Sequence, residues 1–129
     1  MTVYVMAASS FIILLAHGSS DPHWVQPFLE LEQIIRQQEP AAAVAFMELA
    51  EPSLETLIAR ASAEGYQQFS VLPLFFAAGR HLRQDVPRQI QRLEAQFQVS
   101  ISLLPPVGEH PLLTQAIVHI AKDLLQGQP

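Results

Sequence analysis

Short runs of apolar residues recur along the chain, and residues typical of turns follow them. The first run covers residues 11–16 and ends at His17, after which the sequence continues Gly-Ser-Ser-Asp-Pro. A continuous apolar run of this length, bounded by turn residues, is typical of a strand that is buried on both faces of a parallel sheet. Pro73 lies inside a later run and cannot donate to a strand ladder, so we expect regular pairing to end near it. Similar runs predict three further strands at residues 44–49, 69–76 and 99–104.

Between these runs, apolar residues recur at the spacing of amphipathic helices. The first such helix starts near Trp24 and ends at Glu39, because the residue before a proline avoids the helical conformation. Further helices are expected from Pro52 to Gly65, from Asp85 to Phe97 and from Leu113 to Leu124. Strands that alternate with helices form a parallel sheet through right-handed crossovers. The sequence therefore predicts an α/β fold, a flavodoxin-like open parallel four-stranded sheet in the order 2-1-3-4 with helices on both faces.

The chain is long enough for one domain with one core. We predict a single domain over residues 11–126, preceded by a short N-terminal extension of residues 1–10. The extension lacks the basic start of a signal peptide. No apolar stretch approaches the ~18 residues of a membrane-spanning helix. We therefore expect a cytoplasmic protein that does not bind membranes.

The composition narrows the possible chemistry. The 129 residues include no cysteine, which excludes disulfides, thiolate catalysis and thiolate metal sites. Any bound metal must then use His, Asp or Glu. The formal net charge of -5 argues against nucleic acid as a partner. Neither a GxxxxGK[ST] loop nor a GxGxxG motif occurs, so no nucleotide is expected.

Two histidines are expected at the same edge of the sheet. In the order 2-1-3-4, strands 1 and 3 are neighbours whose following helices lie on opposite faces, and ligands bind between the carboxyl ends of such strands. His17 ends strand 1, and His81 lies in the loop after strand 3. Two neutral imidazoles can bind Co²⁺, Fe²⁺ or Ni²⁺, and either can accept a proton near neutral pH. The alternative for His17 is that it only caps the turn.

Glu48 closes strand 2 at the same edge and is the third candidate. It can be a metal ligand, a proton acceptor or a partner that orients His17. The alternative is a solvated residue at a strand end. The other histidines are isolated in the sequence, and we assign them to the surface or to packing: His23, His110 and His119.

The segment before His81 is apolar and the segment after it is basic. Four of the seven basic residues fall within one short window, as Arg80, Arg83, Arg88 and Arg92. An apolar wall with arginines at its rim fits a flat, apolar, polyanionic ligand. The candidate substrate contacts are Ser19, Phe76, Arg80 and Arg83. The alternatives are a solvated helix face for the arginines, core packing for the wall and helix capping for Ser19.

Several of these segments together resemble the small class II chelatases of the CbiX type, which are related to the sirohydrochlorin ferrochelatases. The matching segments, in order, are Leu14–Ser19, Glu48, Pro52–Leu54, Pro73–His81 and Asp85–Pro87. The resemblance implies that His17 and His81 act at a metal-insertion site, where sirohydrochlorin receives Co²⁺ or Fe²⁺. It also implies a homodimer, because the half-length relatives pair. Relatives often carry Arg where this chain has Ser20.

We therefore expect an enzyme, a lyase of the sirohydrochlorin cobaltochelatase or ferrochelatase type. It would insert a divalent metal into a sirohydrochlorin-type tetrapyrrole without ATP, in cobalamin or siroheme biosynthesis. The expected catalytic residues are His17, His81 and Glu48, and the two histidines are the expected metal ligands. The alternative is a non-catalytic metal- or tetrapyrrole-binding protein that stores, delivers or senses its ligand. Turnover would separate these two functions.

Overall fold

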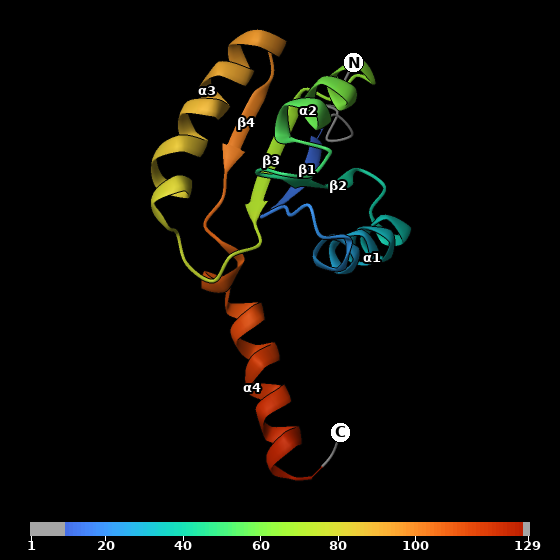
Figure 1. Cartoon of the computed structure of the whole chain (residues 1–129), viewed down its shortest axis with the longest axis vertical. Coiled ribbons are helices and arrows are strands. Elements are labelled where there is room, and N and C mark those ends of the chain that lie inside the picture. The colour runs from blue at the N-terminus through green and yellow to red at the C-terminus, as the bar shows by residue number, and fades with distance from the viewer. Residues whose placement is uncertain (1–9, 128–129) are drawn as a thin grey trace, which may run out of the picture.

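The computed structural model describes residues 10–127 and contains one four-stranded parallel sheet (Figure 1). The strands are β1 (Ser10–Ala16), β2 (Ala42–Phe46), β3 (Gln68–Pro73) and β4 (Ser100–Leu103). Their order is β2-β1-β3-β4, which confirms the predicted order. Leu14 in β1 pairs with Val44 on one side and with Leu72 on the other, so β1 is an inner strand. Apart from Ser10, which opens β1, the predicted N-terminal extension lies outside the described residues.

Four α-helices follow the strands in alternation. They are α1 (Pro22–Gln38), α2 (Leu54–Ala63), α3 (Val86–Phe97) and α4 (Pro111–Leu125). The first two begin at residues whose side chains accept a backbone hydrogen bond, Asp21 before α1 and Ser53 before α2. Such caps satisfy N–H groups that have no partner within the helix. A π-helical turn, His81–Asp85, leads directly into α3, so His81 lies in a helical turn and not in the predicted loop.

Two strands end before their apolar runs do. β2 ends at Phe46 and not at the predicted residue 49, and Leu49 has a φ of 65°, in the left-handed region that a strand does not use. β3 ends at Pro73, which confirms the expectation that regular pairing ends near this proline, because proline offers no N–H to the ladder. Glu48 and Phe76 therefore lie on loops at the carboxyl edge of the sheet.

The two faces of the sheet are covered to different extents. One face packs against α2 and α3 and holds the larger apolar cluster, in which Ile13 and Val71 are fully buried. The other face packs against α1 and holds a smaller cluster of Leu14, Ala16, Val44 and Phe46. Helices therefore lie on both faces, as predicted.

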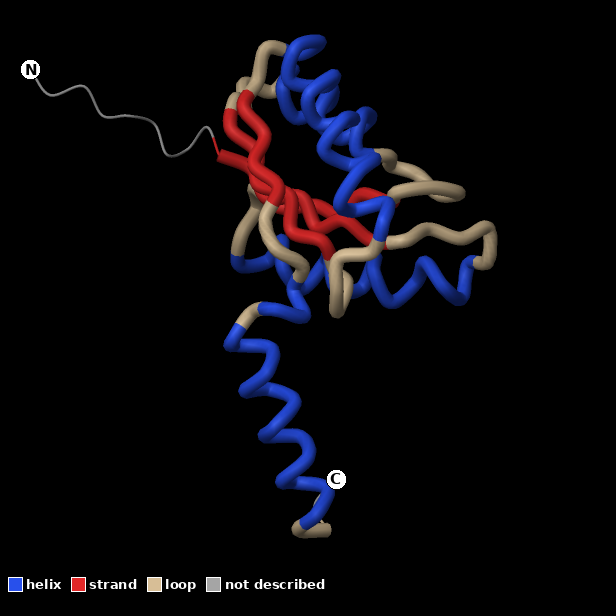
Figure 2. Tube along the Cα trace, turned by 90° about the vertical axis from the view of Figure 1, so that its left-hand side faces the viewer, coloured by secondary structure: helices blue, strands red, loops and turns tan. Residues whose placement is uncertain are grey.

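The fourth helix is present as predicted but does not cover the sheet. In Figures 1 and 2, α4 extends beyond the carboxyl ends of the strands and away from the other helices. None of its residues is buried, and Ile117, Ile120 and Leu124 are 45%, 57% and 67% exposed. Within residues 10–127, no helix combines the length and the apolar character that crossing a membrane requires.

Candidate functional site

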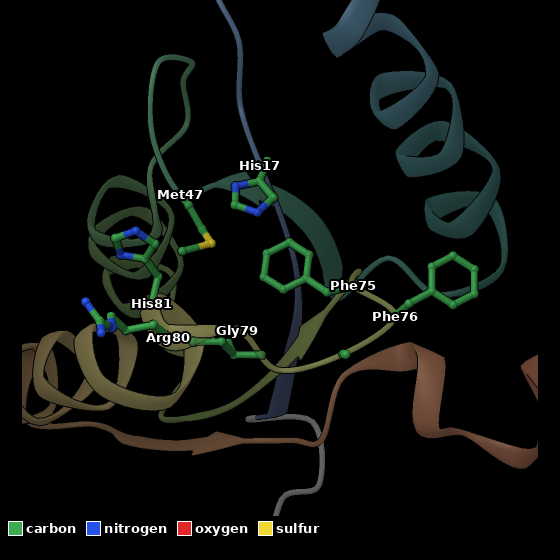
Figure 3. Close-up of a pocket in the computed structure, with 9 residues that line it drawn as sticks. His17, Met47, Phe75, Phe76, Gly79, Arg80 and His81 are labelled. Carbon is green, nitrogen blue, oxygen red and sulfur yellow. The ribbon is translucent and has the colours of Figure 1, made fainter.

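A cavity of about 340 Å³ opens at the carboxyl edge of the sheet (Figure 3). His17 follows β1 directly, and His81 begins the π-helical turn after β3. Because β1 and β3 are neighbours, the two histidines reach the same cavity. The lining residues are His17, Met47, Phe75, Phe76, Ala77, Gly79, Arg80, His81 and Leu82. The fold thus brings the side chains of two histidines that are far apart in the sequence to the same cavity.

The imidazole of His17 is held from two sides. Its Nδ1 atom lies 2.9 Å from Oε1 of Glu48. Its ring stacks on Phe75, with ring centroids 4.6 Å apart. A carboxylate at Nδ1 keeps the proton on that nitrogen, which leaves the lone pair of Nε2 available to a metal or a proton. Among the three roles considered for Glu48, this contact favours orientation of His17.

Gly18 lets the segment of His17 approach the loop of Glu48 closely. The Gly18 N–H donates to Oε2 of Glu48 at 3.3 Å, so this carboxylate contacts two consecutive residues. A Cβ atom at residue 18 would overlap the backbone carbonyl oxygen of Glu48. The Met47 N–H also donates to the carbonyl of Ala16 at 2.8 Å. The bond from His17 to Glu48 therefore depends on a glycine at residue 18.

His81 also has a carboxylate partner, Asp85. The Nδ1 atom of His81 lies 2.6 Å from Oδ2 of Asp85, one helical turn further along the chain. Both side chains are largely exposed, at 73% for His81 and 55% for Asp85. Each histidine of the cavity thus has Nδ1 bonded to a carboxylate.

The aromatic residues of the wall play different parts. Phe75 faces into the cavity beside His17, whereas the ring of Phe76 points away from both histidines (Figure 3). Phe76 is 74% exposed. Met47 lies between the two histidines in the same view. The apolar surface nearest the imidazoles therefore comes from Phe75 and Met47.

The four arginines of the basic window separate in the structure. Arg80 lines the cavity next to His81, whereas Arg83 and Arg88 are exposed and do not line it. Arg92 donates to Glu55 of α2 at 3.2 Å. Arg80 is therefore the arginine of this window that lines the cavity.

Ser19 lies outside the cavity lining. Its hydroxyl accepts a hydrogen bond from the N–H of Asp21 at 3.0 Å, in the turn before α1. Asp21 in turn accepts from the N–H of His23 at 2.9 Å. These bonds match the capping alternative for this segment.

Sequence reasoning did not assign a role to Met47 or to the side chain of Asp85. The four-residue spacing between His81 and Asp85 is a signal that could have identified the pair, since such residues are neighbours on a helix. The position of Met47 has no such signal, because it depends on the turn after β2. Among residues 10–127, no three His, Asp or Glu side chains converge on a common metal position.

The site can perform two kinds of chemistry. A neutral imidazole whose Nδ1 is bonded to a carboxylate offers Nε2 either as a ligand to a divalent metal or as a proton acceptor. Two such imidazoles beside an apolar wall could serve both purposes on one bound molecule. Arg80 adds a positive charge at the edge of the cavity.

Comparison with known families gives a match over most of the chain. A family model described as CbiX matches residues 11–124. A sirohydrochlorin cobaltochelatase from Saccharolobus solfataricus is 30% identical over 114 residues, which cover 83% of this chain and 89% of that protein. A sirohydrochlorin ferrochelatase from Bacillus subtilis is 30% identical over 86 residues, which cover 66% of this chain and 33% of that protein.

Two solved structures share the fold. The crystal structure of a CbiX protein from Marinobacter aquaeolei VT8 has 50% sequence identity and a TM-score of 0.84, and the match covers 91% of this chain and 95% of that one. The sirohydrochlorin chelatase SirB from Bacillus subtilis subspecies spizizenii, in complex with cobalt, has 25% identity and a TM-score of 0.71. That match covers 88% of this chain and 50% of the SirB chain.

Proposed function

The chain belongs to the CbiX family, and from this premise we propose that it inserts a divalent metal ion into sirohydrochlorin. It is a chelatase of the lyase class, and the substrate metal is Co²⁺ or Fe²⁺. The observation that carries the proposal is the cavity that His17 and His81 both line, in a chain of which two sirohydrochlorin cobaltochelatases match 90% and 83%.

Insertion breaks two pyrrole N–H bonds and forms bonds from the ring nitrogens to the metal. Two protons leave as the ion with its two positive charges enters, so the charge of the macrocycle is unchanged. The proposed roles of His17 and His81 are to hold the incoming metal and to accept these protons. One neutral imidazole cannot do both at the same moment, because each task uses the Nε2 lone pair. Two histidines on one cavity allow the tasks to be divided.

Glu48 and Asp85 are proposed as positioning residues. Each accepts a hydrogen bond at Nδ1 of a histidine, which fixes the ring orientation and the tautomer. A carboxylate near the ring also stabilises the imidazolium that forms when Nε2 accepts a proton. Glu48 therefore assists catalysis through His17 in this proposal.

The tetrapyrrole is proposed to lie against Phe75 and Met47, with its carboxylates toward arginine. Arg80 is the proposed carboxylate contact, because guanidinium binds carboxylate with paired hydrogen bonds. Ser19, Phe76 and Arg83 remain weaker candidates, since the first and last do not line the cavity and the ring of Phe76 points away.

The proposal has several further parts. We infer that the protein acts in the cytoplasm as a homodimer and needs no nucleotide. Nucleic acid and membranes are not proposed as partners. Ni²⁺ is a third metal to test, because imidazole ligands accept it as readily as Co²⁺. The pathway served is cobalamin or siroheme biosynthesis.

The test is an anaerobic absorbance assay with sirohydrochlorin and each of Co²⁺, Fe²⁺ and Ni²⁺. We expect many equivalents of metallated product per protein chain, at a rate above the reaction without protein. Stoichiometric binding with no released product would instead identify a storage or delivery protein. Adding ATP is expected to leave the rate unchanged.

A further inference from the structure

His17 is the first residue after β1, and a side chain binds its backbone carbonyl oxygen. The residue before it still belongs to the sheet, because the carbonyl of Ala16 accepts a hydrogen bond from the N–H of Met47 at 2.8 Å. At His17 the donor is the indole of Trp24, whose Nε1 atom lies 2.8 Å from the carbonyl oxygen. The indole N–H therefore supplies a donor at the point where the strand has ended.

The peptide group that joins His17 to Gly18 is held at both of its polar atoms. Its carbonyl oxygen accepts from Trp24, and its N–H donates to Oε2 of Glu48 at 3.3 Å. The two partners come from different elements, α1 and the loop after β2. A peptide group is planar, so holding both atoms fixes its orientation and with it the ψ angle of His17. The bond that directs the imidazole away from the main chain is thereby held relative to the cavity.

The indole of Trp24 is itself supported by other groups. Trp24 lies in the first turn of α1, and its backbone N–H donates to the carbonyl of Asp21 at 3.0 Å. The centroid of its ring lies 6.0 Å from that of Phe28. Phe28 in turn meets the ring of Phe46 edge-on at 6.1 Å, and Phe46 is 1% exposed. This series of aromatic rings connects the indole to the core, so its donor atom has a defined position.

Packing alone does not account for a tryptophan at residue 24. The side chain is 48% exposed, so much of its surface is not used for burial. A phenylalanine also packs against Phe28, but it has no N–H to donate. Trp24 is outside the cavity lining, whereas the residue whose carbonyl it binds is part of that lining. The feature specific to tryptophan is therefore the hydrogen bond to His17.

We propose that Trp24 is a positioning residue for His17. Its N–H holds the main chain of His17, while Glu48 holds the imidazole at Nδ1. Together the two contacts set the direction and the tautomer of this side chain before a ligand binds, which is the kind of preorganisation that reactions at fixed geometry require. The effect on metal insertion rests on the proposed function, whereas the effect on the His17 ring does not.

The test uses the fact that Trp24 is the only tryptophan of the chain. Biosynthetic replacement of tryptophan by its sulfur analogue, benzothienylalanine, therefore changes residue 24 alone. The analogue keeps the two fused rings and has sulfur in place of the N–H, so the donor is lost and the packing is retained. Trp24→Phe removes the donor in a second way. The matched control is Ile35→Ala, which removes apolar contacts between α1 and the same sheet face, away from residue 24. Denaturant unfolding checks that each protein is folded.

The first measurement is ¹⁵N NMR of the neutral His17 ring without metal, assigned by comparison with His17→Ala. In the unmodified chain we expect the proton on Nδ1, as the bond to Glu48 requires. In both proteins that lack the indole N–H, the two ring signals should shift toward the other tautomer. Ile35→Ala should keep the unmodified pattern. Unchanged ring signals after loss of the donor, or an equal shift in Ile35→Ala, would overturn the proposal.

The second measurement is steady-state metal insertion into sirohydrochlorin. Loss of the indole N–H should lower kcat by roughly tenfold, the lower end of the effect of orienting partners. KM for sirohydrochlorin should change by less than about twofold, because the contact with His17 is not a contact with the substrate. A raised KM with unchanged kcat would mean that Trp24 binds the substrate, and would overturn the positioning role. If the unmodified chain inserts no metal, the proposed function fails, and the ring signals alone decide the role of Trp24.

Discussion

The Nδ1 atom of His81 lies 2.6 Å from Oδ2 of Asp85, across one turn of π-helix at the edge of the cavity. His17 has the same arrangement with Glu48, although that carboxylate comes from another strand's loop. Carboxylates that bond to Nδ1 hold an imidazole with Nε2 available, and partners of this kind affect both metal affinity and activity. The two histidines can therefore be tested through their partners as well as directly.

Replacing either histidine tests the site itself. His17→Ala and His81→Ala should each lower the rate of metal insertion by about 100-fold or more, the range of a lost proton acceptor. Stability should change little, because both side chains are substantially exposed. The control is His23→Ala, whose side chain is 97% exposed and lies outside the cavity. Full activity in both cavity variants would contradict the proposed site.

Removing the partner of His81 tests its positioning role. Asp85→Ala should lower kcat by roughly 10- to 100-fold, the usual effect of losing an orienting partner. Asp85→Asn should recover part of the loss, because its amide oxygen can still accept from Nδ1. The matched control is Asp123→Ala, since Asp123 faces His119 with the same spacing on α4, at 3.6 Å. If both variants of Asp85 are as active as the unmodified chain, Asp85 does not position His81.

The variants of Glu48 separate its possible roles. If Glu48 orients His17, Glu48→Gln retains an acceptor for Nδ1 and should be several-fold more active than Glu48→Ala. If Glu48 bound the metal or accepted the proton itself, the amide would replace neither function. The two variants would then be equally impaired. Steady-state kinetics with saturating sirohydrochlorin measure this difference directly.

Arg80→Ala tests the proposed contact with the substrate carboxylates. Because Arg80 is exposed, we expect KM to rise by about two- to fivefold, as for loss of an exposed ion pair of up to ~1 kcal/mol. The effect should weaken at high salt, while kcat stays nearly constant. Arg88→Ala is the control, whereas Arg92 is unsuitable because it is bonded to Glu55. Equal effects of Arg80→Ala and Arg88→Ala would mean that the arginines form only a solvated helix face.

Gly18→Ala tests the close approach behind the bond from His17 to Glu48. The new Cβ would overlap the Glu48 carbonyl, so we expect the free energy of unfolding to fall by about 1–3 kcal/mol. The rate of insertion should fall as well, because the loop of Glu48 must move. For stability the control is Gly79→Ala, whose Cβ would meet no heavy atom within 4 Å. Denaturant unfolding of the two variants checks the difference, and equal stability would contradict the steric argument.

The sequence by itself determined the strand order and the shared edge of the two histidines. Apolar runs bounded by turn residues, with helical spacing between them, specify alternating strands and helices. Right-handed crossovers then make β1 and β3 neighbours. His17 and His81 reach one cavity because the carboxyl ends of neighbouring parallel strands lie at one edge. Local patterns and a general handedness rule were sufficient for this part.

Only the tertiary structure decided how the site is assembled. The bond from Glu48 to His17 requires the loop after β2 to turn back toward Gly18, with Leu49 in the left-handed region. The arginines from residue 80 to residue 92 are close in sequence, but a helix distributes such residues around its circumference. For this reason Arg80 reaches the cavity while Arg92 bonds to α2.

The direction of α4 is the clearest case of a feature that periodicity leaves open. Its apolar residues recur at helical spacing, but this spacing carries no information on the direction in which the helix leaves the sheet. That direction depends on the anchoring of Gly108 against Phe75 and Phe76, a contact between segments that the sequence keeps far apart. Long-range contacts of this kind are formed by the folded chain as a whole, and no local pattern encodes them.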